Sequence, residues 1–110
     1  MKIVDLINET GWTCKACKDH LDTEVSGAYC GDLLSWVMGN GEAAQAWITV
    51  QVHMNVIAVA VLREFSCIII ADNAQLPDEV IAKAEEEGIP VLESELPVFE
   101  TAKKLVELGI

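Results

Sequence analysis

The chain has 110 residues, of which 52% are apolar, so it can fold as one domain around its own core. Its formal net charge is -11, from 18 acidic and 7 basic residues, and this charge disfavours nucleic acids and anionic membrane surfaces as partners. It leaves room for a small anionic ligand that is held by backbone amides.

The sequence also predicts a cytoplasmic protein. Asp5 follows so soon after Lys2 that no apolar signal segment can form, and no apolar stretch approaches the roughly 20 residues that cross a bilayer. We therefore expect the four cysteines to be reduced.

The N-terminal half predicts a helix, two short strands and a second helix. Lys2–Glu9 carries apolar residues at helical spacing, which is typical of a short amphipathic helix. Trp12–Cys17 alternates instead, which predicts a strand that turns Trp12, Cys14 and Ala16 to one face.

The second strand and second helix of this half follow a turn. Asp22–Gly31 predicts a short strand that enters a loop. We expect Asp32 to cap the N-terminus of the helix that follows, because Asp is a preferred N-cap residue. The helix ends at the Gly-Asn-Gly sequence of residues 39–41. Its apolar positions are Leu33, Leu34, Val37 and Met38.

The second half predicts the order β-α-β-α-β-α, which is typical of a mostly parallel sheet. Two of its strands are apolar without a break, as in strands that are buried on both faces. The expected strands are Ala46–Val50, Cys67–Ala71 and Ile89–Leu92, and the expected helices run over Val56–Leu62, from Pro77 to Gly88 and from Pro97 to Gly109.

One of these helices has no polar face. Val56–Leu62 is apolar at every position, which predicts a helix that is buried all round. In a domain of this size one side of such a helix normally faces water, so we expect something to cover it. The candidates are the N-terminal helix, the helix over Leu33–Met38 and a second subunit. A two-fold homodimer is the commonest way to cover such a patch.

Four polar residues, Thr49, Gln51, His53 and Asn55, alternate between the central strand and the apolar helix. If the strand continues they share one side, and if it stops at Val50 they form the loop before the helix. Both geometries place donors at the edge where α/β sheets bind ligands, beside helix amides that suit a phosphate or a carboxylate. The competing interpretation is structural: His53 or Asn55 caps the helix while Gln51 satisfies the loop backbone.

Three cysteines and a histidine form the pattern C-x2-C-x2-H-x9-C, at Cys14, Cys17, His20 and Cys30. Their types would suit a zinc ion. A second C-x2-C is missing, however, and buried cysteines usually act as small apolar residues, so we favour core or incidental cysteines. The sequence places no Ser or Cys nucleophile beside His53.

Segments in order along the chain resemble a DRTGG domain, most clearly from Leu21 onward. The resemblance is to stand-alone DRTGG domain proteins and to the N-terminal domain of HPr kinase/phosphorylase. It implies a layered α/β/α sandwich with a mostly parallel or mixed sheet, in one domain over residues 1–110. It also implies a regulatory or dimer-forming module rather than a catalytic one. The segments are Asp22–Gly27, Gly31–Ser35, Val37-Met38, Trp47–Asn55 with the helix and strand that follow, and Pro77–Gly109.

The sequence departs from the family pattern in two places. The stretch DTEVSGA at residues 22–28 has neither the Arg nor the second Gly of Asp-Arg-Thr-Gly-Gly. The GxxxxGK[ST] phosphate loop of the kinase is absent, so the resemblance does not imply kinase activity. Related segments occur in pyrophosphatases that adenine nucleotides regulate, which makes such a nucleotide a candidate ligand.

These observations favour a non-catalytic regulatory, ligand-sensing or interaction module. We expect it to be homodimeric, to need no cofactor, and to bind a small anionic metabolite such as an adenine nucleotide or to dock on a partner enzyme. The alternative is a small metal- or thiol-dependent redox protein or enzyme that uses the cysteine set or His53. The expected ligand-binding residues are Ser26, Gly27, Asp32, Thr49, Gln51, His53 and Asn55.

Overall fold

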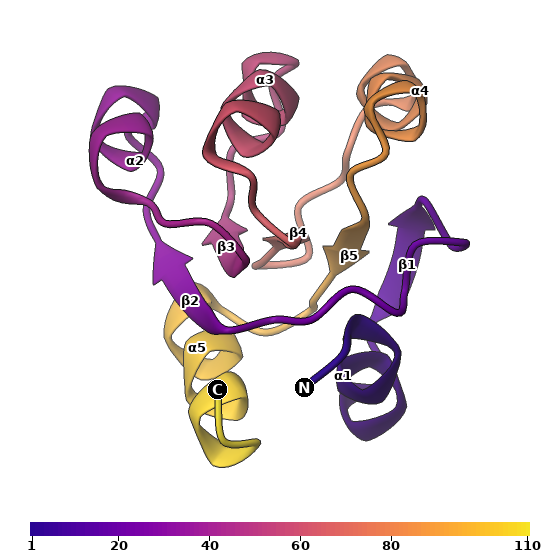
Figure 1. Cartoon of the computed structure of the whole chain (residues 1–110), viewed down its shortest axis with the longest axis vertical. Helices are drawn as coiled ribbons and strands as arrows, with labels where there is room; N and C mark the ends of the chain where they lie inside the picture. The colour runs from indigo at the N-terminus through magenta and orange to yellow at the C-terminus, as the bar shows by residue number, and fades with distance from the viewer.

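A single five-stranded sheet divides the protein into three layers (Figure 1). The computed structural model describes residues 1–110. Helices α2, α3 and α4 cover one face of the sheet, and α1 and α5 cover the other (Figure 1). The elements are α1 (Ile3–Thr10), β1 (Thr13–Ala16), β2 (Gly27–Cys30), α2 (Leu34–Asn40), β3 (Gln45–Thr49), α3 (Asn55–Arg63), β4 (Cys67–Ile70), α4 (Asp78–Glu87), β5 (Val91–Glu93) and α5 (Val98–Glu107).

The strand order is β1-β5-β4-β3-β2. Strands β2 to β5 run parallel, and β1 pairs antiparallel with β5. The predicted mostly parallel or mixed sheet and the α/β/α layers are therefore confirmed. The two short strands of the N-terminal half do not pair with each other: they form the opposite edges of the sheet.

Strand β4 shows why the central strands have no polar face. Ile68 and Ile70 pack under α2, α3 and α4, whereas Cys67 and Ile69 pack against α1 and α5. Both faces of the strand are therefore withdrawn from water, which is the reason that parallel strands in such layers read as unbroken apolar runs.

Strand β1 corrects one expectation. The register between β1 and β5 shifts between Cys14 and Ala16, so Lys15 is the extra residue of a β-bulge. Trp12 and Cys14 pack with α1 and α5, but Ala16 packs on the side of α2 to α4. The prediction that the three share one face is wrong, because the bulge moves Ala16 to the other face.

Asp32 is not the cap of α2, which is a second correction. Helix α2 begins at Leu34, its N-cap residue is Leu33, and no side chain caps it. The Asp32 carboxylate turns instead toward the end of β3. The Thr49 hydroxyl and the Val50 amide both donate to the carboxylate there, and these bonds take the place of the capping bond.

The outer face of α3 is only partly covered. Helices α2 and α4 flank α3 on the same face of the sheet (Figure 1), while α1 lies on the other face. The α2 helix is therefore one of the covering elements, and the N-terminal helix is not. Ala58 and Leu62 remain open to solvent, and Leu62 is 63% exposed. None of the five helices has both the length and the apolar composition that crossing a membrane requires.

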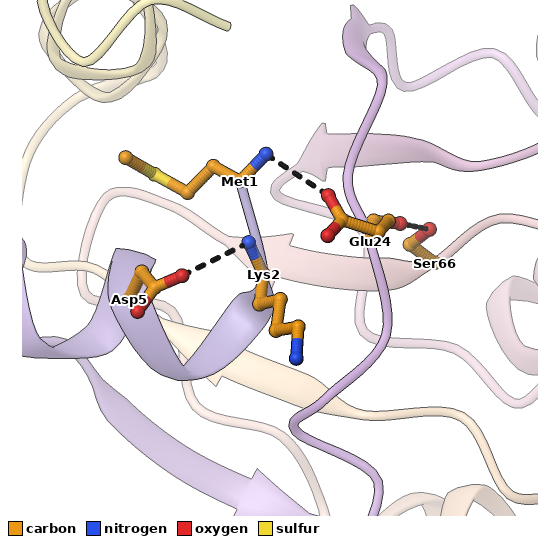
Figure 2. Close-up of polar contacts among 5 residues, drawn as sticks. All are labelled: Met1, Lys2, Asp5, Glu24 and Ser66. Atoms are coloured by element: carbon orange, nitrogen blue, oxygen red, sulfur yellow. Dashed lines mark hydrogen bonds and ion pairs between the residues drawn. The ribbon is translucent and has the colours of Figure 1, made fainter.

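The start of the chain is bound to the segment before β2 (Figure 2). The Met1 amino group lies 3.1 Å from the Glu24 carboxylate, and the Lys2 amide donates to Asp5 at 3.3 Å. The buried Ser66 hydroxyl donates to the backbone carbonyl of Glu24, so this segment is also joined to the start of β4. These bonds hold α1 in place under the sheet.

Candidate functional site

The loop between β3 and α3 holds most of the predicted site residues. Strand β3 ends at Thr49, so the residues from Gln51 to Met54 form a loop at the carboxyl edge of the sheet, and Asn55 begins α3. Of the two geometries that the sequence left open, the loop is therefore the correct one. Parallel α/β sheets bind ligands at this edge.

Asp32 fixes the start of this loop. Its Oδ1 atom accepts a hydrogen bond from the Thr49 hydroxyl at 2.7 Å and another from the Val50 amide at 2.9 Å. The Thr49 side chain is fully buried, and its hydroxyl oxygen also accepts from the Gln51 amide at 3.1 Å. The Gln51 side chain donates to the Asp32 carbonyl oxygen at 3.1 Å. We call these four residues the Asp32 cluster.

His53 has the structural role that the sequence offered as one alternative. Its Nδ1 atom accepts from the Asn55 amide at 3.1 Å, next to the first turn of α3. In the neutral ring the proton then lies on Nε2, which makes Nε2–H a donor. The side chains of His53 and Asn55 are both exposed. The ring thus completes the loop and still offers one N–H group outside it.

Ser26 and Gly27 do not join this group. Gly27 is the first residue of β2, and Ser26 precedes it and donates its amide to the Ala44 carbonyl oxygen. They lie at the amino end of a parallel strand, whereas Asp32 follows its carboxyl end. The seven residues expected to bind a ligand therefore fall into two places, which are separated by the length of β2.

The cysteine and histidine pattern is also spread out. Cys14 lies in β1 and Cys30 in β2, at opposite edges of the sheet. The Cys17 thiol contacts the Ala84 carbonyl oxygen at 3.3 Å, and His20 Nδ1 lies 3.2 Å from the Gly88 carbonyl oxygen. These contacts attach the chain after β1 to the end of α4. No three His, Cys, Asp or Glu side chains lie together as metal ligands.

The buried thiols are held in their protonated form. Burial raises the pKa of Cys67 to about 12. Burial, with the charge of Glu85, raises the pKa of Cys17 to about 11. Because the thiolate is the form that binds metals and attacks substrates, these two thiols are poorly suited to either task at neutral pH. The geometry and the pKa values together speak against the metal or thiol alternative.

Another cavity lies away from this loop and was missed by the sequence analysis. It has a volume of about 400 Å³, at the carboxyl end of β5. We call it the β5 pocket. Its walls come from the α1–β1 turn, Asn73 after β4, the β5–α5 connection and α5. The lining residues are Thr10, Gly11, Trp12, Thr13, Asn73, Glu93, Ser94, Glu95, Leu96 and Lys104.

A strained turn shapes one wall of the β5 pocket. Asp72 and Asn73 both have left-handed backbone conformations, with φ of 61° and 55°. Their amides donate to the carbonyl oxygens of Leu96 at 2.8 Å and Ser94 at 3.0 Å. Such strain persists only where surrounding bonds hold it, and Asp-Asn is a pair that tolerates it. Asp-Asn directly after a buried strand was thus the one sequence signal that pointed to this end of the sheet.

The fold agrees with that of known proteins. Residues 48–108 match the DRTGG domain family, and the chain belongs to that family. The crystal structure of the CBS and DRTGG domains of the regulatory region of Clostridium perfringens pyrophosphatase, complexed with the activator diadenosine tetraphosphate, has a similar fold. The TM-score is 0.74 at 12% sequence identity.

The two matches cover different shares of the chain. The pyrophosphatase match covers 96% of this chain and 46% of the other, so this chain spans about half the length of that structure. The family match begins at Ile48, which leaves the DTEVSGA stretch at residues 22–28 outside it. No curated protein has a sequence that matches this chain significantly.

Proposed function

We propose that this chain is a regulatory domain that senses a small anionic metabolite, such as an adenine nucleotide, and has no catalytic activity of its own. Its membership of the DRTGG family supports a regulatory role, because the similar structure belongs to the regulatory region of a pyrophosphatase that was complexed with a nucleotide activator. The observation that carries the proposal is the start of α3. There, His53 at the end of the loop and Asn55 at the start of α3 are exposed side chains with free donor groups, and the Asp32 cluster fixes the start of the loop.

The chemistry of this place suits an anion. The His53 Nε2–H and the Asn55 side-chain amide are donors, and the positive end of the α3 dipole lies beside them. The Asp32 Oδ1 atom already accepts two hydrogen bonds from within the protein. Because bonds within the chain fix the loop, binding does not have to supply that ordering free energy.

Titration calorimetry with AMP, ATP and diadenosine tetraphosphate tests this proposal. His53→Asn is the informative variant. The Asn side-chain oxygen can still accept the hydrogen bond from the Asn55 amide, while the donor at the more distant Nε2 position is lost. We expect this variant and Asn55→Ala each to weaken nucleotide binding about tenfold. Asn8→Ala, an exposed change on α1, is the matched control and should bind as the parent does. Unchanged affinity in both variants, or no binding of any nucleotide, would contradict the proposal.

We also propose that the functional unit is a homodimer. Leu33 and Trp36 on and beside α2 are 66% and 64% exposed, and Leu62 on α3 is 63% exposed. These side chains belong to one helix layer and leave apolar area in water that a second copy would bury.

Sedimentation equilibrium tests the dimer. The parent protein should sediment as a dimer, and Leu62→Glu should shift the equilibrium to monomer by placing a charge in the buried contact. Val106→Glu, an equally exposed apolar position on α5 in the other layer, is the control and should leave the dimer intact. A parent protein that remains a monomer at all concentrations would rule the homodimer out and would leave a partner enzyme as the occupant of this surface.

A further inference from the structure

A groove lies between α3 and α4, on the helix layer that carries the proposed dimer contact. Its volume is about 280 Å³, and Ala58 contributes only a methyl group to its lining. Ala58 and Leu62 are exposed, so the groove opens to solvent. An exposed apolar surface with a charged rim is typical of an interaction site. We call it the α3–α4 groove, and its lining residues are Ala58, Val61, Leu62, Lys83 and Glu87.

Trp36 is the largest side chain that the same layer leaves in water. It lies on α2 and is 64% exposed. Its ring pairs with no other aromatic ring and its indole N–H has no hydrogen-bond partner, whereas Trp47 makes both contacts. Tryptophan is enriched among the side chains that fill pockets at the centre of protein interfaces. Trp36 is therefore a projecting ring that has no contact site within its own chain.

The projecting ring and the groove lie on opposite sides of α3. Helices α2, α3 and α4 lie side by side in that order, with Trp36 on α2 and the groove between α3 and α4 (Figure 1). A two-fold axis that runs along α3 between two copies exchanges these sides, so each Trp36 faces the groove of the other copy. A two-fold interface needs this reciprocity, because the same two surfaces meet twice.

Charge favours the same arrangement. Helix α4 carries five acidic residues and one lysine, so two α4 helices that faced each other would repel. Helix α2 has no charged residue and can therefore lie over the acidic α4 of a second copy.

The rim of the groove suits an indole ring. Lys83 Nζ lies 3.1 Å from a Glu87 carboxylate oxygen, and both residues line the groove. An ammonium group is attracted to the face of an indole ring, and a carboxylate accepts from its N–H group.

We infer that Trp36 of one copy inserts into the α3–α4 groove of the other, and that two such reciprocal contacts hold the homodimer together. This inference rests on the proposed homodimer and identifies the contact that forms it. The ring packs on Ala58 and Leu62, and its edge meets the pair of Lys83 and Glu87. Leu62→Glu then separates the copies because it places a carboxylate in the groove.

Two variants test the ring and the groove separately by sedimentation equilibrium. We expect Trp36→Ala to raise the dissociation constant of the dimer about 30-fold or more, as loss of a central interface tryptophan does. Ala58→Phe should also raise it, because the added ring fills the groove. Phe99→Ala is the matched control, since Phe99 is an aromatic residue on α5 in the other layer and is 73% exposed. It should leave the dissociation constant unchanged.

Both variants are expected to fold. Trp36 and Ala58 are exposed, so each variant should keep the thermal midpoint of the parent protein when the proteins are compared as monomers at high dilution.

Mixing the two variants tests whether the ring and the groove meet. The Trp36→Ala chain keeps an open groove and the Ala58→Phe chain keeps the ring, so their heterodimer has one complete contact and neither homodimer has any. We expect native mass spectrometry of an equimolar mixture to show the heterodimer in clear excess over both homodimers. A chain with both substitutions can complete no contact with either single variant and is the control.

The outcomes separate this inference from the proposed homodimer. A parent protein that stays monomeric would overturn both. A parent dimer whose dissociation constant neither variant changes would overturn the inference alone. Variants that weaken the dimer but form no excess of heterodimer would also overturn it, because the ring and the groove would then contact other parts of the second copy.

Discussion

Replacing Trp47 with alanine is expected to lower the free energy of unfolding by about 3–5 kcal/mol. The Trp47 side chain is fully buried, and its ring centroid lies 5.6 Å from that of Phe65. Its indole N–H donates to the Gly31 carbonyl oxygen at 2.9 Å. The change leaves a cavity and removes the donor of that carbonyl. Urea denaturation of both proteins at one pH measures the difference.

Trp36 provides a control of the same residue type. In the monomer its side chain is 64% exposed, so Trp36→Ala should change the unfolding free energy by no more than about 0.5 kcal/mol when both proteins are monomeric at high dilution. Trp47→Phe should fall between the two, because it keeps an aromatic ring but not the bond to Gly31. Equal losses for Trp36→Ala and Trp47→Ala would mean that the core is not centred where the structure places it.

The second large effect is expected from a single methyl group at Gly41. A Cβ atom there would overlap the Phe65 ring and would lie 3.0 Å from the Val37 carbonyl oxygen. Phe65 is buried against Trp47 and has little room to move. We expect Gly41→Ala to lower the unfolding free energy by about 1–3 kcal/mol, as overpacking of a dense core does. The backbone φ of Gly41 is -68°, so backbone strain is not the cause.

Gly39→Ala is the matched control, and its sign should be opposite. Gly39 lies within α2, and a Cβ atom there would meet nothing within 4 Å. Alanine is the better helix former, so this variant should gain about 0.5–1 kcal/mol. Thermal and urea unfolding of the two variants side by side check both signs. A gain at Gly41, or a loss at Gly39, would contradict the packing described for α2.

The sequence predicted the elements of the second half well, because unbroken apolar runs and Pro or Gly at helix ends are local signals. Helix α4 begins after Pro77 and ends before Gly88, as expected. The N-terminal half was harder, because the edge strands take their partners from far along the chain. No local pattern shows that β1 pairs with β5, or that Lys15 forms a bulge.

The candidate site was predicted only in part, because sequence patterns show local segments and not contacts between distant ones. The segment from Gln51 to Asn55 is continuous in sequence, so its place at the carboxyl edge could be predicted. Ser26 and Gly27 lie at the amino end of β2, away from this segment. The β5 pocket draws its walls from four separate segments, which come together only after the sheet and α5 are assembled.

The pairing of β1 with β5 bears on the order in which the chain folds. Thr13 pairs with Glu93, so this edge closes a loop that contains most of the protein, whereas the parallel strands join through short crossovers. Long loops cost more chain entropy to close, so we expect α1 and β1 to dock last and to open first. The turn from Thr10 to Thr13 belongs to this late unit and is also a wall of the β5 pocket. The β5 pocket is therefore complete only after the beginning of the chain has docked on the finished sheet.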